Sequence, residues 1–165
     1  MTRAKGPSFK LYFRRRREGK TNFAKRLALI KSGKTRMVVR RSNKNITIQF
    51  IDFHPDGDRT LLTVSGAHLT KVYKWPSKRN MWTAYLAGLM AGKLASKKGV
   101  KDFVLDLGMY MPSKGSVLFA AQKGAADAGL VTSLPKEKIL EEKLFNPPEK
   151  YKLTFNEIKT KLSSG

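Results

Sequence analysis

Positive charge is concentrated in the first quarter of the chain. Residues 1–44 contain 16 lysines and arginines but a single acid, Glu18, which leaves a net charge of +15. Like charges this close together oppose compact packing, so most of this quarter cannot lie inside a core. A disordered solubilising tail is the simplest alternative, but here the basic residues continue into segments with regular apolar patterns. The sequence therefore predicts a basic arm, and elements next to it, that face a polyanion.

The overall composition restricts the fold and the chemistry further. Apolar residues make up 41% of the 165 residues, which is enough for one modest core. Cysteine is absent and only two histidines occur, which excludes disulfide scaffolds, thiolate zinc sites and cysteine nucleophiles. The longest mostly apolar stretch, 81–92, is well below the ~20 residues that span a bilayer. We expect a soluble cytoplasmic protein that has no cofactor, no metal and no membrane partner.

The first regular elements should be a short helix and three strands. Thr21 is a good N-cap residue and Gly33 a good terminator, so a basic amphipathic helix is expected between them. Alternating apolar residues then predict strands over 36–41, 45–52 and 60–65. Their connections are short and rich in turn-forming residues, which favours antiparallel hairpins. In the second strand, threonine and glutamine alternate with apolar residues, so one face of the sheet should be polar.

The second half of the chain alternates between helix and strand. Asn80 is expected to cap a helix that runs through Lys98, and a strand over 103–107 should precede a helix from Ser113 to Ala128. Small residues form one stripe of the long helix and permit close backbone approach. A helical crossover implies parallel pairing of the last strand, and its apolar residues indicate burial on both faces. We therefore predict an α/β fold with a mixed sheet of three antiparallel strands plus one parallel strand, packed with helices.

The predicted organisation has three parts. Residues 1–19 form a basic arm, 20–134 form the α/β domain, and 135–165 form a C-terminal tail with short helices. The arm has no periodic apolar stripe, so we expect it to be disordered alone and ordered on its partner. In the tail, Thr154 begins a capping-box pattern, which predicts the start of the last helix there.

Acidic residues decide whether the chain could be an enzyme. The predicted order of strands and helices resembles that of ribonuclease-H-like nucleases, which hold two metal ions with a cluster of acids. The first predicted strand contains no acid, and Asp56 and Asp58 lie at a hairpin, where turn chemistry alone favours them. Asp102 and Asp106 are expected to pair with nearby lysines. A metal-dependent nuclease that acts on structured RNA is therefore the alternative, not the first choice.

The residues that could bind RNA lie in the arm and the elements next to it. Aromatic rings alternate there with arginines and lysines, a composition in which guanidinium groups take phosphates and rings stack on unpaired bases. The loop 112–116 precedes a helix, where free amides can meet a phosphate, although Ser113 could equally be only a cap. Candidate RNA-binding residues are Arg14, Arg15, Arg16, Arg17, Lys20, Thr21, Phe23, Lys25, Arg26, Arg40, Arg41, Ser42, Asn43, Lys44, Asn45, Ser113, Lys114 and Gly115.

Several segments resemble a known family. The matching segments are 14–21, 26–34, 38–44, 84–88, 112–116 and 119–121. Together they resemble the large-ribosomal-subunit protein that binds 5S ribosomal RNA, called family eighteen in bacteria and family five in eukaryotes, in its archaeal form.

The resemblance implies a specific function. It implies a mixed α/β domain that holds 5S rRNA in the central protuberance of the large subunit and bridges it to the large-subunit rRNA. Neighbouring 5S-associated ribosomal proteins would be its protein partners. The arm and first helix would supply most RNA contacts, and no catalysis would occur. A basic DNA-compacting protein is a further alternative, which competition between folded RNA and duplex DNA would separate.

Overall fold

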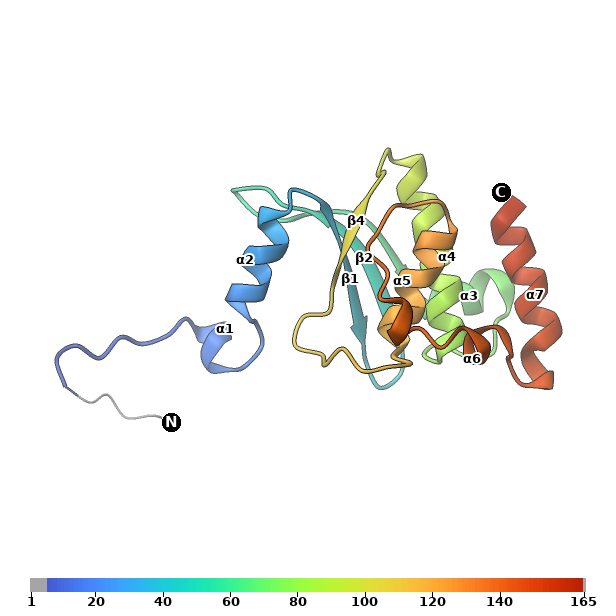
Figure 1. The fold of residues 1–165 in the computed structure, drawn as a ribbon, viewed down its shortest axis with the longest axis horizontal. Helices are drawn as coiled ribbons and strands as arrows, with labels where there is room; N and C mark the ends of the chain where they lie inside the picture. The colour runs from blue at the N-terminus through green and yellow to red at the C-terminus, as the bar shows by residue number, and fades with distance from the viewer. Residues whose placement is uncertain (1–5, 165) are drawn as a thin grey trace.

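A four-stranded sheet forms the centre of the molecule, with α2 on one face and most of the other helices on the opposite face (Figure 1). The computed structural model describes residues 6–164. The strands are β1 (Thr35–Arg41), β2 (Ile46–Asp52), β3 (Arg59–Ser65) and β4 (Phe103–Asp106), in the order β3-β2-β1-β4. β2 pairs antiparallel with β1 and β3, whereas β4 pairs parallel with β1. The predicted α/β fold with a mixed sheet is confirmed.

The helices begin at positions that differ in part from the expected caps. Asn80 is the N-cap of α4, as expected. α2 is capped by Asn22, which accepts from the Lys25 amide, so the expected cap at Thr21 is wrong by one residue. α5 is capped by Ser116 instead of Ser113, because Gly115 adopts a positive φ and turns the loop just before it. The helices are α1 (Arg14–Arg17), α2 (Phe23–Lys31), α3 (Gly66–Tyr73), α4 (Met81–Lys97), α5 (Val117–Asp127), α6 (Glu141–Phe145) and α7 (Glu149–Ser164), with a short 3-10 helix at Lys136–Lys138.

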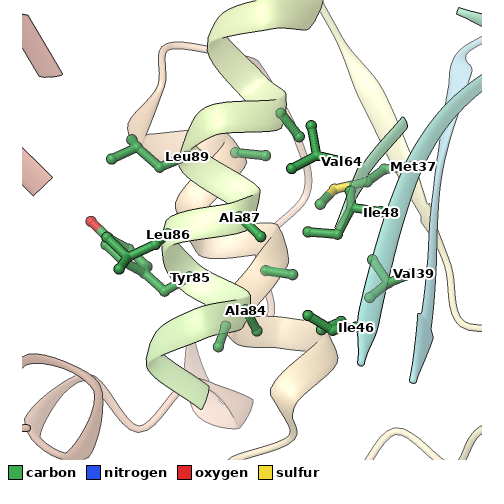
Figure 2. Close-up of a cluster of buried hydrophobic side chains, with 14 of the residues drawn as sticks. Met37, Val39, Ile46, Ile48, Val64, Ala84, Tyr85, Leu86, Ala87 and Leu89 are labelled. Carbon is green, nitrogen blue, oxygen red and sulfur yellow. The ribbon is translucent and has the colours of Figure 1, made fainter. Parts of the chain in front are cut away.

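The core lies between the sheet and α4. In Figure 2, Ala84 and Ala87 of α4 face the strand residues Ile46, Ile48 and Val39, all of which are buried. The opposite side of α4 carries larger side chains, among them Tyr85 and Leu89, that point away from the sheet. α4 is therefore buried on nearly all sides, and burying these apolar side chains supplies the main stabilisation of the fold.

Glycines bring α4 and α5 into backbone contact. A Cβ added at Gly88 would lie 2.1 Å from the carbonyl oxygen of Ala121, and one added at Gly124 would lie 2.1 Å from that of Tyr85. Any side chain at either position would force the helices apart. The expected small-residue stripe is thus confirmed, and its partner is α5.

β4 is only partly buried. Phe103 and Asp106 are buried, but Val104 and Leu105 are half-buried. The expectation that β4 is buried on both faces is therefore wrong: β4 is an edge strand, and Val104 on the outer face and Leu105 on the core face both keep partial exposure. No helix in residues 6–164 is long and apolar enough to cross a membrane.

The C-terminal segment contributes to the core. Its last helix, α7, begins at Glu149, so the start expected at Thr154 is wrong. Phe155, on its inner face, is 1% exposed, and its ring lies 6.3 Å from that of Trp75 and 5.8 Å from that of Tyr85. The division at residue 134 stays a prediction, but the segment after it shares the core of the domain before it.

Candidate nucleic-acid interface

The arm presents its charge to solvent. The four arginines of α1 are all exposed, although no helix was expected in this segment. Glu18 lies 3.7 Å from Arg14 Nε and 2.8 Å from Lys20 Nζ, and Arg15 Nε donates a hydrogen bond of 2.8 Å to the Thr21 hydroxyl. One carboxylate cannot neutralise this many cations, so the segment keeps a large positive charge for an external partner.

Aromatic rings lie among these cations. The rings of Phe13 and Phe23 are 5.9 Å apart, and the guanidinium of Arg16 lies 4.2 Å from the centre of the Tyr12 ring. Phe13 is 78% exposed and Tyr12 is 59% exposed. Exposed rings of this kind serve as stacking surfaces for unpaired bases.

Several candidate residues converge on a cavity between α2 and the outer face of the sheet. The cavity has a volume of about 910 Å³ and is lined by residues from the arm, α2, β1, β4 and the loop after β4. We call it the α2 cavity. The candidate residues that line it are Arg15, Lys20, Thr21, Lys25, Arg26 and Arg40.

An ion-pair network holds the floor of the α2 cavity together. Asp58 Oδ2 lies 2.7 Å from Arg26 Nη2 and 2.6 Å from Arg36 Nη2. Asp106 lies 3.6 Å from Arg36 and 3.5 Å from Arg40. The side chains of Arg26 and Arg40, which we expected to bind RNA, are thus partly committed to carboxylates within the protein.

Arg36, which is 3% exposed, joins the two carboxylates and was missed as a site residue. Arg36 and Arg40 are four residues apart on β1, so their side chains point to the same face of the sheet. This spacing is the sequence signal that could have placed Arg36 beside Arg40.

The two aspartates around β4 have different partners. Asp102 Oδ2 lies 2.9 Å from Lys34 Nζ, as expected. The expectation that Asp106 pairs with lysine is wrong, because the parallel pairing of β1 with β4 brings Arg36 and Arg40 beside it.

The turn between β1 and β2 forms a second basic cluster. Ser42 and Asn45 hydrogen-bond to each other across the turn, and Arg79 Nη1 donates a bond of 2.6 Å to the Asn43 carbonyl. A cavity of about 620 Å³ lies here, lined by Arg41, Lys44 and residues 76–80. Lys78 and Arg79 were missed in the sequence, since their loop carries no motif and only the tertiary structure brings it to the turn.

Residues of the loop after β4 line two different cavities. Pro112 lines the α2 cavity, whereas Lys114 lines a different cavity of about 790 Å³ together with Glu137, Glu141 and Glu142. The amide of Gly115 donates a bond of 2.9 Å to the Lys138 carbonyl, which ties the loop to the C-terminal segment. Lys114 therefore faces acidic side chains, unlike the arginines of α1.

The carboxylates do not form the cluster that a two-metal nuclease requires. Within residues 6–164, no three acidic or histidine side chains lie close enough to hold a metal ion together. The aspartates nearest the sheet instead pair with basic side chains or, for Asp52, accept a bond of 2.6 Å from the Thr35 hydroxyl.

Known proteins share most of this sequence. A sequence model of the family described as "Ribosomal large subunit proteins 60S L5, and 50S L18" matches residues 7–104. The chain is 46% identical over 127 residues to the protein named "Large ribosomal subunit protein uL18" of Aeropyrum pernix, an alignment that covers 76% of this chain and 59% of the relative. It is 47% identical over 128 residues to the uL18 of Haloarcula marismortui, covering 77% and 68%, and 48% identical to that of Korarchaeum cryptofilum, covering 77% and 65%.

The family match includes most of the arm, the strands β1 to β3 and α4, and it ends within β4. The alignments with the three relatives span only about three-fifths to two-thirds of the relatives' own lengths. The family consists of structural ribosomal proteins and not of enzymes, so the nuclease alternative is wrong. On this match over well more than half of its length, the chain belongs to the family of ribosomal large subunit proteins 60S L5 and 50S L18.

Proposed function

We propose that this chain is a structural constituent of the large ribosomal subunit that binds 5S rRNA. It anchors that RNA in the central protuberance and bridges it to the large-subunit rRNA, beside neighbouring 5S-associated proteins. The observation that carries the proposal is the exposed arm, in which four consecutive arginines have one nearby carboxylate and contribute nothing to the core. The named relatives, all large-subunit proteins, support the ribosomal part of the proposal.

The arm and the α2 cavity have different roles in this proposal. The guanidinium groups of α1 bind phosphates, and Tyr12, Phe13 and Phe23 stack on unpaired bases. Lys20 and Lys25, at the rim of the α2 cavity, extend the phosphate contacts towards the sheet. Binding therefore releases counterions, and the phosphate contacts supply much of the affinity.

The proposal is tested by titrating the purified full chain with three nucleic acids in the same buffer: 5S rRNA, an unrelated folded RNA of similar length, and duplex DNA. We expect 5S rRNA to bind at least about tenfold more tightly than either competitor, a difference of about 1.4 kcal/mol. Equal affinity for the three would contradict 5S recognition. Preference for the duplex DNA would instead support a DNA-compacting role.

A second measurement needs no added ligand. RNA extracted from the protein purified at low salt should contain a species of 5S size, well above its share in the starting lysate. A random distribution of RNA lengths would contradict specific recognition and leave only general affinity for polyanions.

A further inference from the structure

The cavity beside the β1–β2 turn has the properties of a separate phosphate-binding groove. Most of its lining residues come from the β1–β2 turn and from the segment just before α4; Figure 1 shows this turn at the lower end of the sheet. We call it the α4 groove and define it by its four cations, Arg41, Lys44, Lys78 and Arg79. Two of them come from the turn and two from a loop more than 30 residues away in sequence.

In the part of the chain that the structure describes, the four cations of the α4 groove have no carboxylate partner. None of these four side chains lies within ion-pair distance of an acid, whereas Arg36 and Arg40 on the outer face of β1 and Arg26 on α2 are all paired. Nor does any acidic residue within 6–164 line the groove. Four like charges that converge without compensation oppose folding, so their placement fits a polyanion that supplies the compensation from outside.

The α4 groove is held in shape before any ligand arrives. The Ile46 amide donates a bond of 3.0 Å to the Lys78 carbonyl, and Arg79 donates to the Asn43 carbonyl. A Cβ at Gly66 would lie 2.2 Å from the Lys78 carbonyl oxygen, so the loop passes directly over a glycine. A preformed site loses less conformational entropy on binding than a flexible one.

The start of α4 borders the groove, because its N-cap residue Asn80 is one of the lining residues. Asn80 is the N-cap, but its side-chain oxygen accepts from the hydroxyls of Ser77 and Thr83 and makes no bond to the amides of the helix. The hydroxyl of Thr83 is held in turn by a bond of 2.8 Å from Trp75 Nε1, which is buried. Amides at a helix start that lack a side-chain cap are suited to phosphate oxygens.

The α4 groove and the α2 cavity are connected through two adjacent residues. Arg40 lines the α2 cavity and Arg41 lines the α4 groove, because successive residues of β1 point to opposite faces of the sheet. A single RNA strand that leaves the α2 cavity at Arg40 can therefore pass around the end of β1 and enter the groove at Arg41.

We propose that the α4 groove binds the ribose-phosphate backbone of the same RNA that the arm engages, through Arg41, Lys44, Lys78, Arg79 and the first amides of α4. This inference rests on the proposed function. It adds a second contact point, on the opposite side of β1 from the α2 cavity, and assigns Lys78 and Arg79 a role that their sequence context does not indicate.

The test replaces the two loop cations by Lys78→Gln and Arg79→Gln in one full-length variant. A matched control carries Lys150→Gln and Lys152→Gln, which remove the same charge from exposed positions on α7. Affinity for 5S rRNA is measured over a series of salt concentrations for the wild type and both variants, after thermal melting has established that each is folded. If the double variant melts at a lower temperature because the Arg79 bond to Asn43 is lost, the single variant Lys78→Gln is used in its place.

We expect the groove variant to bind more weakly than the control and its slope of log K against log salt to become shallower by about 1.4–1.8, the value for two lost phosphate contacts. For Lys78→Gln alone, half that change is expected. If the wild type binds 5S rRNA selectively but the groove variant and the control behave alike, the α4 groove is not a binding site. If the wild type shows no selectivity, the proposed function itself fails.

Discussion

At the scale of single residues, Asp58 and Asp106 allow three arginines, Arg36 and Arg40 of β1 and Arg26 of α2, to converge on the α2 cavity. Arg36 is almost completely buried, and its Nε has no acceptor among the described residues. The two carboxylates therefore provide its whole electrostatic compensation. A buried charge that loses its partner is strongly destabilising, even where the pair as a whole adds little stability.

We predict that Asp58→Asn destabilises the protein, because it keeps the shape of the side chain but removes the charge beside Arg36 and Arg26. Fully buried pairs lose about 3–5 kcal/mol when one partner is removed. The Asp58 side chain keeps 25% exposure, so we expect a loss at or below the lower end of that range. Chemical denaturation measures it. Asp56→Asn is the control, since that side chain is 92% exposed, and equal effects at the two positions would contradict the network.

Gly88 is the residue whose size matters most for the packing of α4 on α5. We predict that Gly88→Ala lowers the free energy of unfolding by at least about 2 kcal/mol, because the new Cβ meets a backbone carbonyl that cannot rotate away. In an exposed helix the same change would stabilise by about 0.5–1 kcal/mol. Ser96→Ala, on the exposed side of α4, is the control for helix propensity. An unchanged melting temperature for Gly88→Ala would contradict the close contact.

At the scale of elements, the arm and the C-terminal helix have opposite roles. The contacts of the described part of the arm are with its own neighbours and the start of α2, as in the Phe13–Phe23 pair and the bond from Arg15 to Thr21. α7, in contrast, inserts Phe155, Ile158 and Leu162 into the core. The N-terminal arm should therefore contribute to RNA binding, and α7 should contribute to the stability of the fold.

We predict that deleting residues 1–19 leaves the melting temperature nearly unchanged but strongly reduces the affinity for 5S rRNA. The deletion removes a net charge of +6 and the aromatic rings of Phe9, Tyr12 and Phe13, but no buried side chain of the described part. A change below about 1 kcal/mol shifts melting by no more than about 2–4 °C in a protein of this size. Melting and RNA titration of one sample test both parts. A sharp fall in the melting temperature would mean that the arm packs on the domain. If the affinity for RNA is retained, the RNA-binding surface lies elsewhere on the protein.

For α7, we predict that Phe155→Ala lowers the free energy of unfolding by about 3–5 kcal/mol, the range for removing a buried aromatic side chain. Leu153→Ala on the same helix is the control, because Leu153 is 77% exposed. It should change stability by less than about 0.5 kcal/mol. Similar small effects for both variants, measured by denaturation, would mean that the helix is not part of the core.

At the scale of the whole molecule, the net charge of +22 sets how binding responds to salt. With about 6–10 phosphate contacts, affinity for 5S rRNA should fall by about 10³–10⁵ between 50 and 200 mM salt. Titration over that range measures the slope. A nearly flat dependence would exclude phosphate contacts as the main source of affinity, whatever the selectivity among RNAs.

Much of the architecture could be predicted because its causes are local. The alternation of Ile46, Ile48 and Phe50 with polar residues defines β2, and the short turns on either side impose antiparallel pairing. The start of α4 could be predicted from an equally local signal, because asparagine is a preferred N-cap residue and Asn80 directly precedes the helix. Caps separated from their helix by a flexible residue were harder to predict. The turn at Gly115 displaced the start of α5 from Ser113 to Ser116, and both serines fit the local pattern equally well.

The candidate site was predictable only in part. The exposed cations of α1 and of the β1–β2 turn follow from composition, because dense positive charge cannot be buried. Lys78, Arg79 and Arg36 were missed, since their roles depend on segments far apart in sequence: the loop before α4 meets the turn, and Asp58 and Asp106 meet β1.

The sequence by itself determined the α/β class, the antiparallel and parallel pairings that follow from hairpins and one crossover, and the concentration of positive charge at the N-terminal end. These follow from periodicity and charge, which act over a few residues. Tertiary structure alone decided which cations are free and which are paired, where the α4 groove lies, and that the C-terminal segment belongs to the core. Ion pairing and burial depend on which distant segments come within a few ångströms, and no local pattern encodes that distance.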